Sequence, residues 1–324
     1  MEVSLNDTVN QSRRTEYQCR SRGLLQERVD MEKVKAVLST SENGHFSVIK
    51  NEAYNGFYAC ISALRHAFRW GTVPVVKVAQ RDKIIQFPPE LDLPWGFIRR
   101  RYGITSQGGN VMSNLQCNID NATRRVAYAI NGSMPEPIPS AEYYLIYSFT
   151  EPERKALPVY YHLVQSIRCY EKGQRQACLA HLQGISIHLK SVFRIYYENV
   201  VESKIPRHVF TAYIQGFHGW AAGEFIEDEY VEYDGTSGAH LVLFNVLDYF
   251  LGLEPFFDEQ DFMRYFSHSQ RRFMASVKAH AFRTAAEQAN NFGLTEQFEK
   301  IAKQLRSWNY ALNTVILNPP ANGT

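Results

Sequence analysis

The stretch "DGTSGAHLVLFNVLDYFLG", residues Asp234 to Gly252, combines a turn signal and a helix signal. It begins as a tight turn of small residues and runs directly into an apolar segment that closes with Leu-Gly. His240 stands where the turn meets the apolar segment. Residues at helical spacing form one stripe, made of His240, Phe244, Leu247 and Leu251. This spacing predicts a helix over Leu241–Leu251 that turns one apolar face toward the protein interior.

The segments on either side have the same helical spacing. Long amphipathic runs separated by Gly, Pro and Asn fill residues 145–317, with little strand signal after position 130. Thr150, followed by Glu151 and Glu153, has the pattern of a helix N-cap. We therefore expect a mainly α fold, a large helical bundle with a small irregular N-terminal part. Three of its helices are expected side by side, namely Leu241–Leu251, Phe262–Ala279 and Gln297–Val315.

The composition divides the chain unevenly. Residues 1–45 are polar and poor in apolar periodicity, which favours a disordered or loosely helical arm. We expect a small N-terminal region over 46–130, a helical domain holding a cofactor and substrate pocket over 131–318, and a tail over 319–324.

Charge and cysteine content narrow the possible partners. The 35 Lys and Arg nearly balance the 33 Asp and Glu, so nothing indicates a nucleic-acid partner. No apolar run is long enough to span a membrane. The five cysteines show no metal-binding spacing, and no signal peptide precedes them. We therefore expect a cytoplasmic protein that binds neither nucleic acid nor membrane.

Histidines on apolar helix faces are the main chemical signal, since no nucleotide-binding, zinc-protease or hydrolase motif occurs. One stripe contains His181, Ile185, His188, Val192 and Ile195. A later stripe contains Phe262, Phe266, Phe273, Val277 and His280. Each ring must find a polar partner away from water. The pattern fits either structural histidines bonded to carbonyl groups or an internal cavity with polar walls.

Three further segments join the opening stretch in one series: "AYIQGFHGW", "RYFSHSQRRFM" and "QLRSWNYALNTVI". The residues compared in the opening stretch are Gly235, Ser237, Gly238, Phe244, Asp248, Leu251 and Gly252. Those in the three further segments are, in the same order, Tyr213, Gly216, Phe217 and Gly219; Arg264, Tyr265, Arg271 and Phe273; and Leu305, Arg306, Ser307 and Trp308. In order and spacing, over roughly residues 145–317, they resemble the indoleamine and tryptophan 2,3-dioxygenase superfamily of haem-dependent aromatic oxygenases. The chain looks closer to the biosynthetic branch, which includes the second enzyme of pyrrolnitrin biosynthesis.

The resemblance implies a role for the small-residue corner. In that family the turn closes over a haem edge and bound substrate, where a Cβ atom would collide. Hydroxyl groups of the turn would then bond the substrate or a haem propionate, and His240 would look into the pocket. The pocket residues implied are Gly235, Thr236, Ser237, Gly238, His240, Arg207, Phe217, His218 and Asn309.

The sequence departs from the family at two positions. The family's axial histidine, on the terminal helix, corresponds to Asn309, and an amide is a poor ligand for haem iron. Either another group binds the iron, with His280 the best substitute and Tyr310 a lesser one, or haem is absent, or the register differs. The substrate-carboxylate arginine corresponds to Thr211, for which Arg207 can substitute.

These features lead to one expected function and two alternatives. The resemblance implies an oxidoreductase of secondary metabolism, either a monooxygenase or a dioxygenase. In such an enzyme haem b binds dioxygen, and the protein orients a small aromatic substrate, such as an aromatic amino acid or its derivative. The first alternative is a haem-free relative that binds or rearranges a small aromatic compound. The second is a non-catalytic interaction protein.

Overall fold

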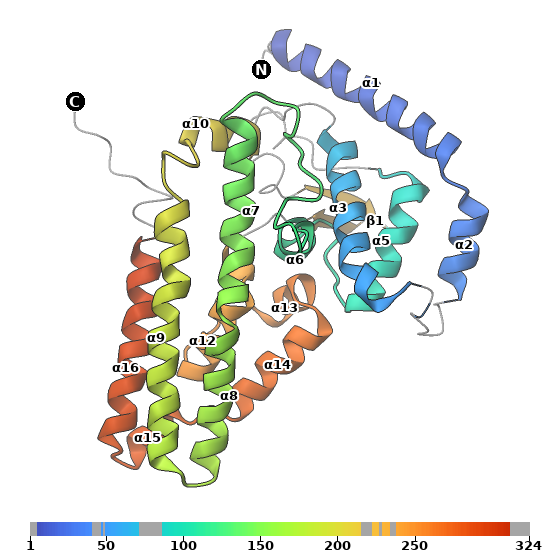
Figure 1. Ribbon diagram of the computed structural model, residues 1–324. Helices are drawn as coiled ribbons and strands as arrows, with labels where there is room; N and C mark the ends of the chain where they lie inside the picture. The colour runs from blue at the N-terminus through green and yellow to red at the C-terminus, as the bar shows by residue number, and fades with distance from the viewer. Residues whose placement is uncertain are drawn as a thin grey trace. The chain divides into compact units, whose positions relative to one another are not determined.

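The computed structural model describes residues 5–40, 47, 49–70, 86–214, 222–226, 229–233 and 238–311. The fold is mainly α, which confirms the prediction (Figure 1). Two short strands depart from the expected all-helical span: β1 (Ala222–Ile226) pairs antiparallel with β2 (Glu229–Tyr233). The chain divides into two compact units, each built from three separate parts of the sequence, in place of the contiguous regions that we expected.

The first unit comprises Met1–Ile146, Ile205–His240 and Gln260–His268. Its helices are α1 (Leu5–Arg28), α2 (Met31–Ser39), α3 (Tyr54–Trp70), α5 (Pro89–Tyr102), α6 (Val111–Asn114), α10 (Arg207–Val209) and α13 (Glu259–Tyr265), with short turns η1 (Asn51–Ala53), η2 (Gln116–Asn118), η3 (Phe210–Ile214) and η4 (Gly238–His240). Tyr58, Trp95 and Phe97 centre its core, where α3 packs against α5. Helices α1 and α2 occupy the segment that we expected to be a disordered or loosely helical arm.

The second unit is a helical bundle. Helix α7 (Ile138–Lys155) ends in it, and its other helices are α8 (Leu157–Glu171), α9 (Arg175–Asn199), α12 (Val242–Leu251), α14 (His268–Ala279), α15 (Arg283–Gln288) and α16 (Phe292–Ala311). Figure 1 shows α8, α9 and α16 running alongside one another, and α9 contacts both of its neighbours. Completely buried side chains such as Leu182, Leu189 and Ile301 fill the space between them.

Helix α12 forms where the opening stretch predicts it. Gly252 ends it in the left-handed conformation, with φ of 66°, which a residue without Cβ adopts at little cost. By contrast, the single helix expected over Phe262–Ala279 is wrong: the chain breaks at Phe266–Ser267 between α13 and α14. Thr150 does not cap a helix either, because it lies inside α7.

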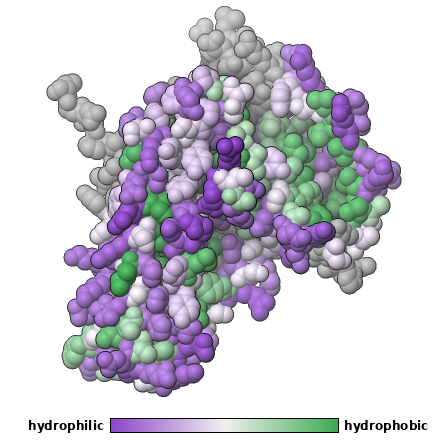
Figure 2. All heavy atoms as spheres, in the orientation of Figure 1, coloured by the Kyte–Doolittle hydropathy of each residue, from purple (hydrophilic) through white to green (hydrophobic). Residues whose placement is uncertain are grey.

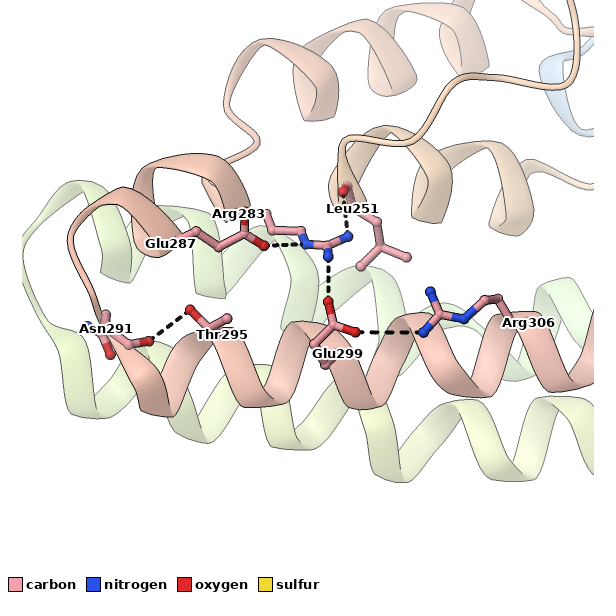
Figure 3. Close-up of polar contacts among 7 residues, drawn as sticks. All are labelled: Leu251, Arg283, Glu287, Asn291, Thr295, Glu299 and Arg306. Atoms are coloured by element: carbon pink, nitrogen blue, oxygen red, sulfur yellow. Dashed lines mark hydrogen bonds and ion pairs between the residues drawn. The ribbon is translucent and has the colours of Figure 1, made fainter.

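Arg283 ties three helices of the second unit together (Figure 3). Its guanidinium group donates to the Leu251 carbonyl at the end of α12, at 3.2 Å, and pairs with Glu287 of α15 at 2.9 Å. It also pairs with Glu299 of α16 at 2.6 Å, and Glu299 lies 3.6 Å from Arg306. Because the arginine side chain is only 19% exposed, these partners satisfy a largely buried charge.

Within the described ranges, no helix is both long and apolar enough to cross a membrane. All five cysteines are unpaired thiols, namely Cys19, Cys60, Cys117, Cys169 and Cys178.

Candidate functional site

His240 lies at the start of the candidate site predicted from the sequence. It ends η4 just before α12, is 6% exposed, and its ring stacks on Tyr265 with the centroids 3.8 Å apart. Burial lowers the pKa of His240 to about 3, so the ring is neutral near pH 7. Gly238 begins the same turn and is partly exposed.

Most of the other predicted pocket residues lie outside the described residues. These are Gly235, Thr236, Ser237, Phe217 and His218, together with the side chain of Asn309, whose backbone belongs to α16. Arg207 begins α10 as an exposed residue, and its carbonyl accepts a hydrogen bond from the Thr211 hydroxyl at 2.8 Å. The structure therefore does not assemble the predicted set into one described site.

The expectation that His280 faces the core is wrong. It follows the last residue of α14, its side chain is 57% exposed, and its Nδ1 lies 2.6 Å from a Glu171 carboxylate oxygen. The ring thus belongs to a surface pair.

The described residues do not fit a haem at the family's position. On α16, the Trp308 ring stacks on Phe244 of α12 with centroids 4.1 Å apart, and Tyr196 of α9 lies 5.2 Å from Trp308. These rings fill the space between the helices one residue before Asn309. In addition, α16 contains no His, Cys or Met to bind iron axially.

A buried polar cluster holds the start of α12. Glu153 of α7 accepts a hydrogen bond from the Leu243 backbone N–H at 3.1 Å and from the Tyr160 hydroxyl at 2.6 Å. Burial raises the pKa of the Glu153 carboxyl group. Sequence reasoning missed this cap, because 90 positions separate Glu153 from Leu243. We assign the cluster to positioning α12, whose first N–H groups otherwise lack acceptors.

Three histidines meet where α8 packs on α9. His162 Nδ1 lies 3.0 Å from His181 Nδ1, and the His162 ring stacks on His188 at 5.3 Å. Gly184 allows this approach, because a Cβ atom there would lie 2.6 Å from the His162 ring. Burial lowers the pKa of His162, and the neighbouring histidines add to the effect. Nowhere in the described parts are three or more His, Cys, Asp or Glu side chains arranged to hold a metal ion.

An open groove of about 500 Å³ lies between α9 and α16, and this volume falls in the range of small-molecule sites. Its apolar contacts come from Ile187, Phe193 and Tyr197 of α9. Ile187 is 65% exposed and Tyr197 53% exposed, so both offer surface to a ligand. Figure 2 shows single apolar side chains, in green, among the hydrophilic surface of the second unit.

Two buried polar atoms of the groove residues have no partner among the described residues. Gln304 Nε2 donates to the Ser186 carbonyl at 3.1 Å, which joins α16 to α9. Gln304 Oε1 and Ser186 Oγ, however, are both buried without a hydrogen bond. Such atoms are uncommon in folded proteins and call for a partner that the structure does not contain.

Lysines supply the charge of the groove. Lys190 comes from α9, and Lys300 and Lys303 come from α16. The ammonium group of Lys300 lies 2.8 Å from Glu296, one turn earlier. Lys190 and Lys303 have no acidic or hydrogen-bonding partner within the described part of the chain. None of the described residues that line the groove is Asp or Glu, so this part of its lining is cationic.

The sequence matches no known protein family, and its comparison with curated proteins gives no match either.

Proposed function

We propose that this protein binds a small aromatic compound, without haem, in the groove between α9 and α16. The observation that carries the proposal is the pair of buried atoms without partners, Ser186 Oγ and Gln304 Oε1, in residues that line the groove. A buried polar atom without a hydrogen bond costs about 1–3 kcal/mol. A ligand that supplies both partners recovers this energy once both side chains turn these atoms toward the groove.

Aromatic contact provides the second part of the binding energy. Tyr197 and Ile187 of α9 line the groove and are 53% and 65% exposed, whereas Phe193 is only 6% exposed and its ring already stacks on Trp308. A flat ring placed against Tyr197 and Ile187 buries apolar surface and gains the preferred contact between two aromatic rings at Tyr197. The compound is therefore expected to combine an aromatic ring with polar groups at one end.

Replacing Tyr197 by alanine should weaken binding of an aromatic probe. Loss of one ring contact corresponds to roughly a three- to tenfold rise in Kd. We would titrate the protein with 2-naphthoate and with its neutral analogue 2-naphthamide, by calorimetry. Tyr161 of α8 is similarly exposed, at 58% against 53% for Tyr197, and lies outside the groove, so Tyr161→Ala is the matched control. The proposal fails if neither probe binds, or if the control variant weakens binding as much.

A haem-dependent aromatic oxygenase is the second candidate. It rests on the resemblance of the sequence and on the mainly α fold, whereas the rings of Tyr196, Phe244 and Trp308 between α9, α12 and α16 argue against it. Its test is the absorption spectrum of protein expressed with a haem precursor. We expect no Soret band from the wild type. A Soret band with one haem per chain would replace the first proposal by the second.

A further inference from the structure

The charge of the groove restricts the ligand further. Lys190 and Lys303 approach the groove from opposite helices, α9 and α16, and neither has a partner within the described ranges. Lys300 adds a third ammonium group, which Glu296 partly neutralises. The described lining of the groove contains no carboxylate. An anionic ligand therefore gains an attraction to these ammonium groups that a neutral ligand does not gain.

The polar atoms of the groove indicate a second feature of the ligand. The Ser186 carbonyl only accepts hydrogen bonds, so the atom of Gln304 that lies 3.1 Å from it must be the amide nitrogen. The remaining Gln304 Oε1 is therefore an acceptor without a donor. Ser186 Oγ, in a residue that is 9% exposed, can donate to an anionic oxygen.

We propose that the groove selects an aromatic oxyanion, a carboxylate or phosphate on a flat ring, that also carries a hydrogen-bond donor. Lys190 and Lys303 hold the anionic oxygens, and the Ser186 hydroxyl donates to one of them. Gln304 Oε1 accepts from the donor of the ligand, and Ile187 and Tyr197 contact the ring. This inference rests on the proposed function, since it specifies the ligand of the same groove.

The contribution of the two lysine charges to the binding affinity should depend on the salt concentration. Both lysines are exposed, so their attraction to an anion is screened within about 10 Å at 0.1 M ionic strength. Binding of 2-naphthoate should weaken between 50 and 500 mM NaCl (about 0.05–0.5 M ionic strength), whereas binding of 2-naphthamide should change little. Equal salt dependence of the two probes would contradict the assignment of the lysines.

A calorimetric comparison of four probes tests the inference. The probes are 2-naphthoate, 2-naphthyl phosphate, the neutral 2-naphthamide, and 3-amino-2-naphthoate, which adds a donor next to the carboxylate. We expect at least one anionic probe to bind about tenfold or more tightly than 2-naphthamide, as two ammonium contacts imply. The tighter of the two anions identifies the head group. The added amino group should tighten binding about two- to tenfold through Gln304.

Matched variants assign the preference to particular side chains. Replacing Lys190 and Lys303 together by glutamine should reduce the anion preference to about threefold or less. Lys172→Gln, at an exposed lysine just after α8 and outside the groove, should leave the preference unchanged. If 2-naphthamide binds wild type as tightly as the anions do, the inference fails and the proposed function stands. If no probe binds, the proposed function fails and the inference falls with it.

Discussion

Replacing Phe298 by alanine should lower the free energy of unfolding of the second unit by about 3–5 kcal/mol, the usual cost of removing a buried phenylalanine ring. Phe298 lies on α16 and is completely buried. Its ring contacts Phe250 of α12 at 5.3 Å and Phe282, just before α15, at 5.2 Å. Because three helical segments converge on this ring, little of the resulting cavity can close.

Hydrogen exchange in increasing denaturant would measure this effect separately for each unit. Peptides from α9 and α16 should lose protection in the Phe298→Ala variant at a lower denaturant concentration. Phe292 lies on the same helix but is 81% exposed, so Phe292→Ala should change stability by less than about 0.5 kcal/mol. Similar losses in both variants would mean that α16 does not pack on the bundle in the way described.

Acidification should destabilise the first unit through His240. The pKa of His240 is about 3 in the folded chain and about 6.5 when unfolded. Between these values the unfolded chain binds a proton that the folded chain does not. Stability is therefore present above pH 6.5 and is lost as the pH falls, by about 1.4 kcal/mol per pH unit, or roughly 2.7 kcal/mol by pH 4.5.

A His240→Phe variant should show a flatter decline of stability between pH 6.5 and 4.5, measured by hydrogen exchange of α13 peptides. His280→Ala removes an exposed histidine and should keep the wild-type slope. Asp248 in the second unit acts in the opposite direction. Burial raises the pKa of Asp248 to about 6, so protonation below pH 6 favours the folded state of that unit. A wild-type slope in His240→Phe would show that His240 is not buried in neutral form.

Helix α12 was predictable because its signals are local. Its apolar stripe, the turn before it and the closing Gly252 all lie within one short stretch, and each favours the same structure. The wrong prediction that His280 faces the core also has a local cause. The count of helical turns places Val277 correctly, since it is buried, but it assumes that the helix continues through His280. Helix α14 ends at Ala279, so His280 lies beyond the helix and does not share its buried face.

The candidate site depends on contacts that periodicity does not reveal. Gln304 meets the Ser186 carbonyl across 118 positions of the sequence. On each helix alone, the lysines of the groove follow the ordinary pattern of a solvated face. Only the packing of α9 against α16 brings Lys190 and Lys303 to one groove and leaves two buried polar atoms beside them without partners.

Methyl NMR of isoleucine-labelled protein, titrated with 2-naphthoate, tests directly whether the ligand binds in the groove between α9 and α16. Ile187 lines the groove and is 65% exposed, so the ring current of a bound naphthalene should shift its methyl signal in a saturable manner. Ile98 is completely buried in the first unit and serves as the internal reference, with no shift expected. The predicted result is a saturating shift at Ile187 and none at Ile98. A saturating shift at other isoleucines with Ile187 unchanged would contradict binding in this groove.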